Sequence, residues 1–139
     1  MLHGLPLPRR DTDSEQFWSG LDEGRLCLPR CPACGTFRWP PGPVCPSCGE
    51  LGAEWVTSEG RGEVFSWVVV HVALLDALAD QLPYAVGLVT VAEGVRLVGT
   101  IEGCDPDQVR AGMPVQARVV AAGEHGPGAL TFVAEPQDG

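Results

Sequence analysis

Lysine is absent from this 139-residue sequence, and all nine basic residues are arginine. A mechanism that forms a Schiff base on a lysine amine is therefore excluded. Acidic residues outnumber basic ones by 18 to 9, which gives a formal net charge of −9. A protein that binds nucleic acid needs a basic face to neutralise phosphates, so we expect no nucleic-acid partner.

Long apolar runs and targeting segments are absent as well. The valine run at residues 68–70 is interrupted by His71 and is far too short to cross a bilayer. The first residues lack the basic start and the long apolar core of a secretory leader. We therefore expect a cytoplasmic protein with no membrane contact.

Residues that usually carry catalysis are few. The sequence has three histidines and contains no Gly-x-Ser-x-Gly elbow, phosphate loop or dinucleotide fingerprint. No nucleophile is paired with a base in a recognisable pattern. The sequence therefore predicts no catalytic residue, and we expect the chain not to be catalytic on its own.

Two matching cysteine knuckles are the most informative motif that is present. Residues 31–35 are Cys-Pro-Ala-Cys-Gly and residues 45–49 are Cys-Pro-Ser-Cys-Gly. Two facing knuckles place four thiolates around one ion, so Cys31, Cys34, Cys45 and Cys48 are predicted to hold a structural Zn²⁺. Two disulfides in a secreted protein are a weaker alternative. The same ligands also hold iron in rubredoxin-like electron carriers, which is a second alternative.

The first 24 residues are predicted to form an N-terminal arm and a short helix. A proline-rich arm at residues 1–10 precedes Asp13, which resembles a helix N-cap with glutamine three residues later. The helix is expected over residues 14–23 and is expected to end at Gly24. Phe17 and Trp18 lie on one side of it. This aromatic pair can dock on the chain's own barrel or on another protein, and the sequence leaves both possibilities open.

Residues 25–59 are predicted to form a rubredoxin-like zinc ribbon and residues 60–136 a five-stranded barrel. From Gly60 the pattern changes to alternating β-branched and polar residues, with turn residues between the runs. A long connection follows the third strand, as in the Greek-key barrel of the oligomer-binding (OB) type. The expected strands are residues 64–72, 84–91, 95–101, 114–121 and 129–134. The predicted fold class is mainly β.

Several short motifs follow one another in a fixed order: Phe17-Trp18, Trp39-Pro40-Pro41, the second knuckle, Trp55, Gly60-Arg61-Gly62-Glu63-Val64, Pro83-Tyr84-Ala85-Val86 and Glu93-Gly94-Val95. In this order they closely resemble the acyl-CoA-associated zinc-ribbon and OB-fold proteins, known as domain of unknown function 35 (DUF35). The resemblance runs from about Asp13 to Pro136, which is nearly the whole chain.

This resemblance implies a non-catalytic accessory subunit of a thiolase-fold acyl-CoA enzyme, either a thiolase or a retro-aldolase, in a hetero-oligomer. Cleavage of a steroid side-chain CoA thioester is one implied activity. The subunit is expected to stabilise its partner and to help form the acyl-CoA site. A subunit of an acyl-CoA hydratase is an alternative, as is the iron electron carrier.

The resemblance also implies two further sets of site residues. The helix and the ribbon typically pack on the partner, which points to an interface at Phe17, Trp18, Trp39, Pro40 and Pro41. Contact with CoA phosphates would need local positive charge in this acidic chain. The candidates for that contact are Arg38, Arg61, Arg96 and Arg118.

Overall fold

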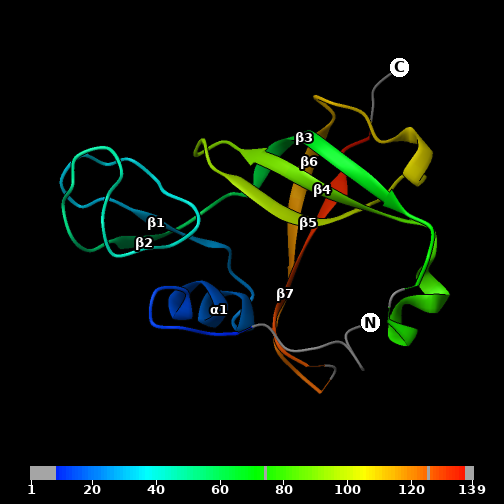
Figure 1. Cartoon of the computed structure of the whole chain (residues 1–139), viewed down its shortest axis with the longest axis horizontal. Helices are drawn as coiled ribbons and strands as arrows, with labels where there is room; N and C mark the ends of the chain where they lie inside the picture. The colour runs from blue at the N-terminus through cyan, green and yellow to red at the C-terminus, as the bar shows by residue number, and fades with distance from the viewer. Residues whose placement is uncertain (1–8, 74, 125, 137–139) are drawn as a thin grey trace.

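The computed structural model describes residues 9–73, 75–124 and 126–136. The described part consists of an α-helix, a two-stranded sheet and a five-stranded barrel (Figure 1). The elements are α1 Glu15–Asp22, β1 Cys27–Arg30, β2 Glu54–Thr57, β3 Arg61–Val70, β4 Tyr84–Val91, β5 Arg96–Glu102, β6 Pro114–Val120 and β7 Ala129–Ala134, with 3₁₀ helices η1 Asp76–Gln81 and η2 Pro106–Gln108 between barrel strands. Most of the proline-rich arm predicted at residues 1–10 lies outside the described residues.

Helix α1 begins one residue later than predicted. Ser14 occupies the N-cap position, so the predicted cap at Asp13 is wrong. The Asp11 carboxylate accepts hydrogen bonds from the backbone N–H of Ser14 (2.8 Å) and from its hydroxyl (2.7 Å). Asp11 thus closes the polar turn that precedes the helix. The helix ends before Gly24 as predicted, and Gly24 has a φ of +87°, which glycine adopts readily.

Strands β1 and β2 pair antiparallel and form the base of the ribbon. Leu28 on β1 is fully buried, and the Arg30 guanidinium donates to the Glu54 carboxylate on β2 at 2.8 Å. The chain between the two strands, residues 31–53, carries both cysteine knuckles. Figure 1 shows this loop region projecting to the left of the barrel.

The five remaining strands close into a barrel in the order β3-β4-β5-β7-β6, with β6 returning to β3. Strands β5 and β7 are parallel, and the other neighbours are antiparallel. This is the Greek-key arrangement of an OB-fold. The predicted fold class, mainly β with a ribbon followed by a five-stranded OB barrel, is confirmed. Strands β4 and β7 have the predicted bounds, and the others differ by one to three residues.

The barrel interior is filled by residues that alternate along the strands. On β4, Ala85, Val89 and Val91 are buried and the residues between them are half-buried or glycine. Among the described residues, Phe132 on β7 is the largest side chain that is fully buried. Gly99 on β5 leaves room for it, since a Cβ there would lie 2.9 Å from the Phe132 ring.

Helix α1 is fastened to the turn between β6 and β7. The backbone N–H of Ala122 donates to the Asp22 carbonyl (2.9 Å), and that of Gly128 donates to the Asp22 carboxylate (2.8 Å). The Arg10 guanidinium donates to the same carboxylate at 2.6 Å. The Gly128 N–H, followed by Arg10, lowers the pKa of Asp22. The helix therefore packs on the β6 and β7 side of the barrel (Figure 1).

Gly128 is predicted to be essential to this helix packing. A Cβ at Gly128 would overlap the Leu21 carbonyl group, so Gly128→Ala should lower the free energy of unfolding by about 2 kcal/mol or more. Gly42→Ala is the matched control, because a Cβ at Gly42 meets no atom within 4 Å. Urea unfolding of both variants checks the prediction. Equal stabilities would contradict the close approach of α1 to the turn.

Among residues 9–73, 75–124 and 126–136, none of the helices has the length and hydropathy of a bilayer-spanning segment, and α1 has only eight residues.

Candidate functional site

The two knuckles have the same backbone geometry. In the first, the N–H of Cys31 donates to the Thr36 carbonyl (2.9 Å) and the N–H of Gly35 donates to the Cys31 carbonyl (3.0 Å). In the second knuckle, the N–H of Cys45 donates to the Glu50 carbonyl and the N–H of Gly49 donates to the Cys45 carbonyl, both at 2.9 Å. Gly35 and Gly49 have φ of +77° and +80°, a conformation that costs glycine little. The repeated Cys-Pro-x-Cys-Gly sequence therefore produces two equivalent turns.

These turns bring four sulfur atoms into one cluster. The Sγ atoms of Cys31, Cys34, Cys45 and Cys48 all lie within 4.8 Å of one another. The Cys31–Cys48 and Cys34–Cys45 sulfur pairs, each joining one knuckle to the other, are 3.6 Å apart. A tetrahedral Zn²⁺ site with Zn–S bonds of about 2.3 Å has sulfur–sulfur edges of about 3.8 Å. The cluster has the size and donor set of a closed tetrathiolate site.

The four sulfur atoms also change one another's ionisation. Hydrogen bonds with the side chain and the backbone of Thr36 lower the pKa of Cys34 to about 6. The backbone N–H of Glu50 lowers the pKa of Cys48, but the Cys31 sulfur, burial and the other two sulfurs together raise it to about 12. Four thiolates this close repel one another, whereas a divalent cation at their centre stabilises all four.

The two remaining cysteines lie elsewhere. Cys27 on β1 is buried, with its sulfur 3.9 Å from the Thr57 hydroxyl, and it packs in the core outside the four-sulfur cluster. Cys104 follows β5, and burial together with Asp105 raises the pKa of its thiol. The four-sulfur cluster of the described residues therefore uses only the two knuckles.

The aromatic residues predicted for a partner interface are divided between the core and the surface. Phe17 is 7% exposed and makes edge contacts with Trp18 (4.9 Å between ring centres) and Trp39 (4.8 Å). Trp18, Trp39 and Pro41 are half-buried and Pro40 is exposed. Phe17 thus fixes α1 against the ribbon, and the other four residues supply the accessible surface.

Arg38 and Arg96 line one groove between ribbon and barrel, with a volume of about 590 Å³. Arg38 is 5% exposed, and its guanidinium donates to the Gly52 carbonyl inside the ribbon. Its charge is therefore covered rather than presented to a phosphate. The Arg96 guanidinium lies 3.7 Å from the centre of the Phe65 ring, and its Nε donates to the Thr90 hydroxyl at 3.3 Å.

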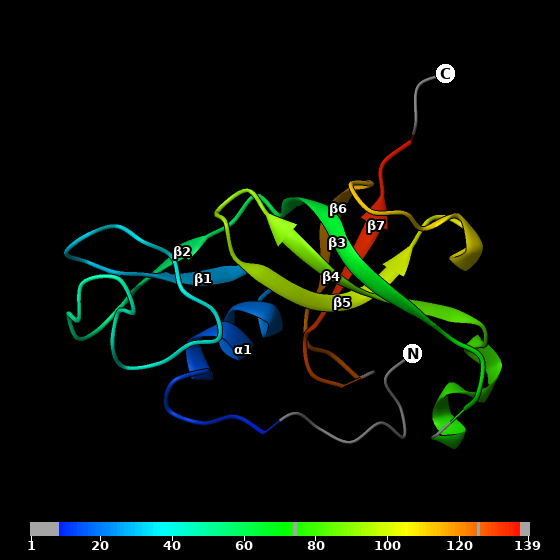
Figure 2. The same cartoon turned by 45° about the horizontal axis from the view of Figure 1, so that its top comes forward.

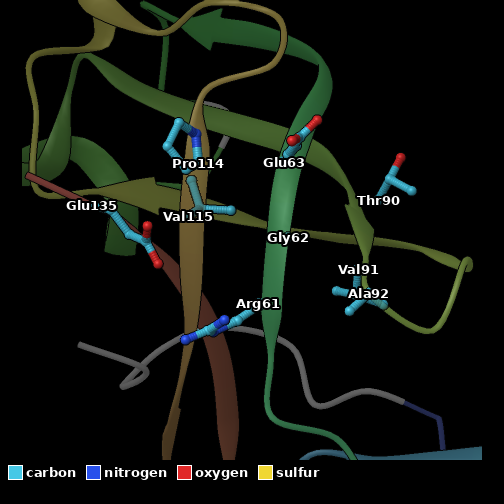
Figure 3. Close-up of a pocket in the computed structure, with 9 residues that line it drawn as sticks. All are labelled: Arg61, Gly62, Glu63, Thr90, Val91, Ala92, Pro114, Val115 and Glu135. Atoms are coloured by element: carbon cyan, nitrogen blue, oxygen red, sulfur yellow. The ribbon is translucent and has the colours of Figure 1, made fainter. Parts of the chain in front are cut away.

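The other two predicted phosphate contacts lie apart from this groove. Arg61 lines a pocket of about 520 Å³ that also contains the Glu63 and Glu135 carboxylates (Figure 3). Arg118 on β6 lies 3.9 Å from the Glu102 carboxylate. The four arginines are thus not gathered in one basic pocket.

Exposed apolar residues on the barrel were not found by sequence reasoning. Phe65, Val68 and Val98 are 50%, 61% and 65% exposed. Six of the seven residues at 64–70 are apolar, so the sequence does not show which face of this strand is exposed to solvent. A β-bulge between Val64 and Ser66 then changes the alternation.

The fold and the sulfur cluster define a class of two-module protein, a rubredoxin-like zinc-ribbon region followed by an OB-fold barrel. Family models agree with this class. Residues 18–52 match the model of the ChsH2 rubredoxin-like zinc ribbon domain, and residues 55–120 match that of the ChsH2 C-terminal OB-fold domain. The chain belongs to the DUF35 family of zinc-ribbon and OB-fold proteins.

Among solved structures, a chain of the Ltp2-ChsH2(DUF35) aldolase matches with a TM-score of 0.83 and 35% identity, over 92% of this chain and 98% of that chain. A DUF35 domain-containing scaffold protein of Methanocaldococcus jannaschii is 36% identical over 82% of each chain.

Two longer relatives contain a similar module. A probable enoyl-CoA hydratase alpha subunit of Thermomonospora curvata is 40% identical over 79% of this chain. The 3-oxo-4,17-pregnadiene-20-carboxyl-CoA hydratase alpha subunit of Mycobacterium tuberculosis is 36% identical over 81% of this chain. This chain spans only 34% and 35% of the length of those two proteins.

Proposed function

We propose that this chain is a non-catalytic, zinc-binding subunit of an acyl-CoA aldolase of the thiolase fold. The main support for this proposal is the structural match to a chain of the Ltp2-ChsH2(DUF35) aldolase. The match extends over almost the whole length of both chains. The scaffold name of a full-length relative points in the same direction.

The proposed metal is a structural Zn²⁺ held by Cys31, Cys34, Cys45 and Cys48. Four protein ligands complete a tetrahedron and leave no position for a substrate or a reactive water. An ion in this site would fix the fold of residues 31–53, and its chemistry would not take part in the reaction. Iron in the same site, as in an electron carrier, is the alternative, but a minimal electron carrier has no need of the attached barrel.

The proposed partner interface includes Trp18, Trp39, Pro40 and Pro41. Large aromatic side chains near the centre of an interface often supply much of its binding energy. The buried Phe17 ring packs against both tryptophans and so helps to hold them in place. Docking of the partner here would order the ribbon next to the shared acyl-CoA site.

The proposed substrate is an acyl-CoA, with a steroid side-chain CoA thioester as the specific candidate. A relative with this module is named for a pregnadiene carboxyl-CoA, which is such a thioester. The positive charges of this chain are dispersed, and Arg38 is covered. We therefore propose that the partner supplies most contacts to the CoA phosphates, and that Arg61, Arg96 and Arg118 contribute at the edges.

A second candidate is a subunit of an enoyl-CoA hydratase. It is favoured by the two hydratase alpha subunits that contain a matching module. Because this chain covers about a third of each, the hydratase part would have to come from another chain.

A reconstitution experiment tests the proposed function. The chain alone, an Ltp2-type aldolase subunit alone and their mixture are assayed for retro-aldol cleavage of a steroid side-chain acyl-CoA. We expect no turnover by the chain and efficient turnover by the mixture only. Turnover of an acyl-CoA by the chain alone, or full activity of the aldolase subunit without it, would contradict the proposal. Hydration without cleavage, after addition of a hydratase subunit, would favour the second candidate.

A further inference from the structure

The outer side of three barrel strands, β3, β4 and β5, is unusually apolar. On β4 the buried residues Ala85, Val89 and Val91 point into the barrel, so Val86 and Leu88 point outward. Their neighbours across the sheet share the same face. One row is Val68–Val86–Thr100, and the next is Ser66–Leu88–Val98. The solvent-exposed face of an antiparallel sheet normally carries polar and charged residues.

Charged residues lie at the margin of this face. The third row across the same strands is Glu63–Thr90–Arg96, and Glu102 lies at the opposite end of β5. The Arg96 guanidinium stacks on the half-exposed Phe65 ring. We name Phe65, Val68, Val86, Leu88 and Val98 the outer apolar face.

The described elements of the chain leave this face uncovered. Helix α1 packs mainly on β1, β6 and β7. Figures 1 and 2 show the three strands side by side, with α1 and the ribbon to one side of them. The 50–65% exposure of Phe65, Val68 and Val98 agrees with that arrangement. A contiguous exposed apolar surface bordered by polar groups is typical of a protein-binding site.

The outer apolar face is continuous with the groove beside the ribbon. Arg96 belongs to both, since it stacks on Phe65 and also lines the groove together with Trp39 and Pro40. One surface therefore runs from the proposed aromatic interface of the ribbon, past Arg96, onto the barrel.

Charge argues against a second copy of this chain as the occupant. Each copy carries a formal net charge of −9, and carboxylates lie at both margins of the face. A surface with an apolar centre and basic side chains around it would be complementary instead.

We propose that the outer apolar face is a second part of the docking surface for the aldolase subunit, contacted by an apolar patch that basic side chains surround. This inference rests on the proposed function. It extends the interface from the ribbon to the barrel, so that the partner holds both modules and fixes their relative orientation.

The test compares substitutions of two valines with nearly the same exposure. Val98→Glu introduces a carboxylate in the middle of the face, and Val72→Glu introduces the same charge beyond the end of β3; the two side chains are 65% and 67% exposed. The probe is the purified Ltp2 subunit of the solved aldolase, titrated with each full-length chain. We expect Val98→Glu to weaken binding about tenfold or more and Val72→Glu to change it less than about threefold.

Further measurements separate the possible outcomes. Val68→Glu, on the neighbouring row, should reproduce the loss, and unchanged melting temperatures would show that the variants fold. Equal affinities of the Val98→Glu and Val72→Glu chains would overturn this inference alone. Failure of the unaltered chain to bind Ltp2 would contradict the proposed function as well. An unaltered chain that dimerises by itself, with Val98→Glu restoring the monomer, would assign the face to a second copy and overturn the proposal.

Discussion

Replacement of Cys31 by serine is expected to lower bound metal from one ion per chain to nearly none. Cys31 is 1% exposed, and its sulfur belongs to the four-sulfur cluster. Binding of a structural zinc ion contributes directly to the folding free energy of its module. Residues 31–53 should therefore unfold, while the barrel should keep its β structure, because its buried residues, such as Phe132 and Val89, lie outside that segment. Metal analysis and circular dichroism measure the two effects.

Cys27→Ser is the matched control for this substitution. Cys27 is also buried but lies outside the cluster, so its replacement should leave the metal content unchanged. A Cys31→Ser chain with one bound ion and an unaltered melting temperature would refute the assignment of the ligands. The absorption spectrum identifies the metal, since zinc tetrathiolate is colourless in the visible range and iron tetrathiolate is not.

Phe17→Ala is expected to cost about 3–5 kcal/mol of folding free energy, the range for removal of a buried aromatic ring. The ring is 7% exposed and contacts both Trp18 and Trp39. The folded fraction should still bind the partner, because Phe17 itself offers almost no surface. Thermal unfolding and partner affinity, measured on the same preparation, separate stability from binding.

Trp18→Ala provides the contrast to Phe17→Ala. Trp18 is half-buried, so part of its ring can meet a partner. Its removal should weaken the complex by roughly 2 kcal/mol if it is a binding hot spot, with no loss of metal. A Phe17→Ala chain of normal stability but reduced affinity would instead place Phe17 in the interface. Reduced stability with unchanged affinity in Trp18→Ala would remove Trp18 from the interface.

The sequence predicts the features that depend on short-range geometry. The glycines and the paired cysteines of each knuckle determine a local turn, and two such turns are enough to predict the cluster. The barrel strands follow from alternation and from turn residues such as Gly94, which limit the possible pairings. The order of the strands then follows from the long connection between β5 and β6.

Features that depend on competition between distant groups could not be predicted. The N-cap of α1 was missed for a local reason, because Ser14, whose backbone N–H and hydroxyl donate to Asp11, takes the position that we expected for Asp13. The sequence shows that Phe17 and Trp18 are aromatic neighbours. It does not show that Trp39, which is distant in sequence, packs on the Phe17 ring. The outer apolar face was missed because its residues come from three strands, and the sequence does not show which face of β3 is exposed.

Native mass spectrometry of the tagged chain purified from its own host tests the central claim most directly, because it measures the metal and the partner together. The account predicts a hetero-oligomer that contains a thiolase-fold aldolase subunit and one zinc ion per copy of this chain. A chain recovered without zinc, or recovered only as a monomer or as copies of itself, would contradict it.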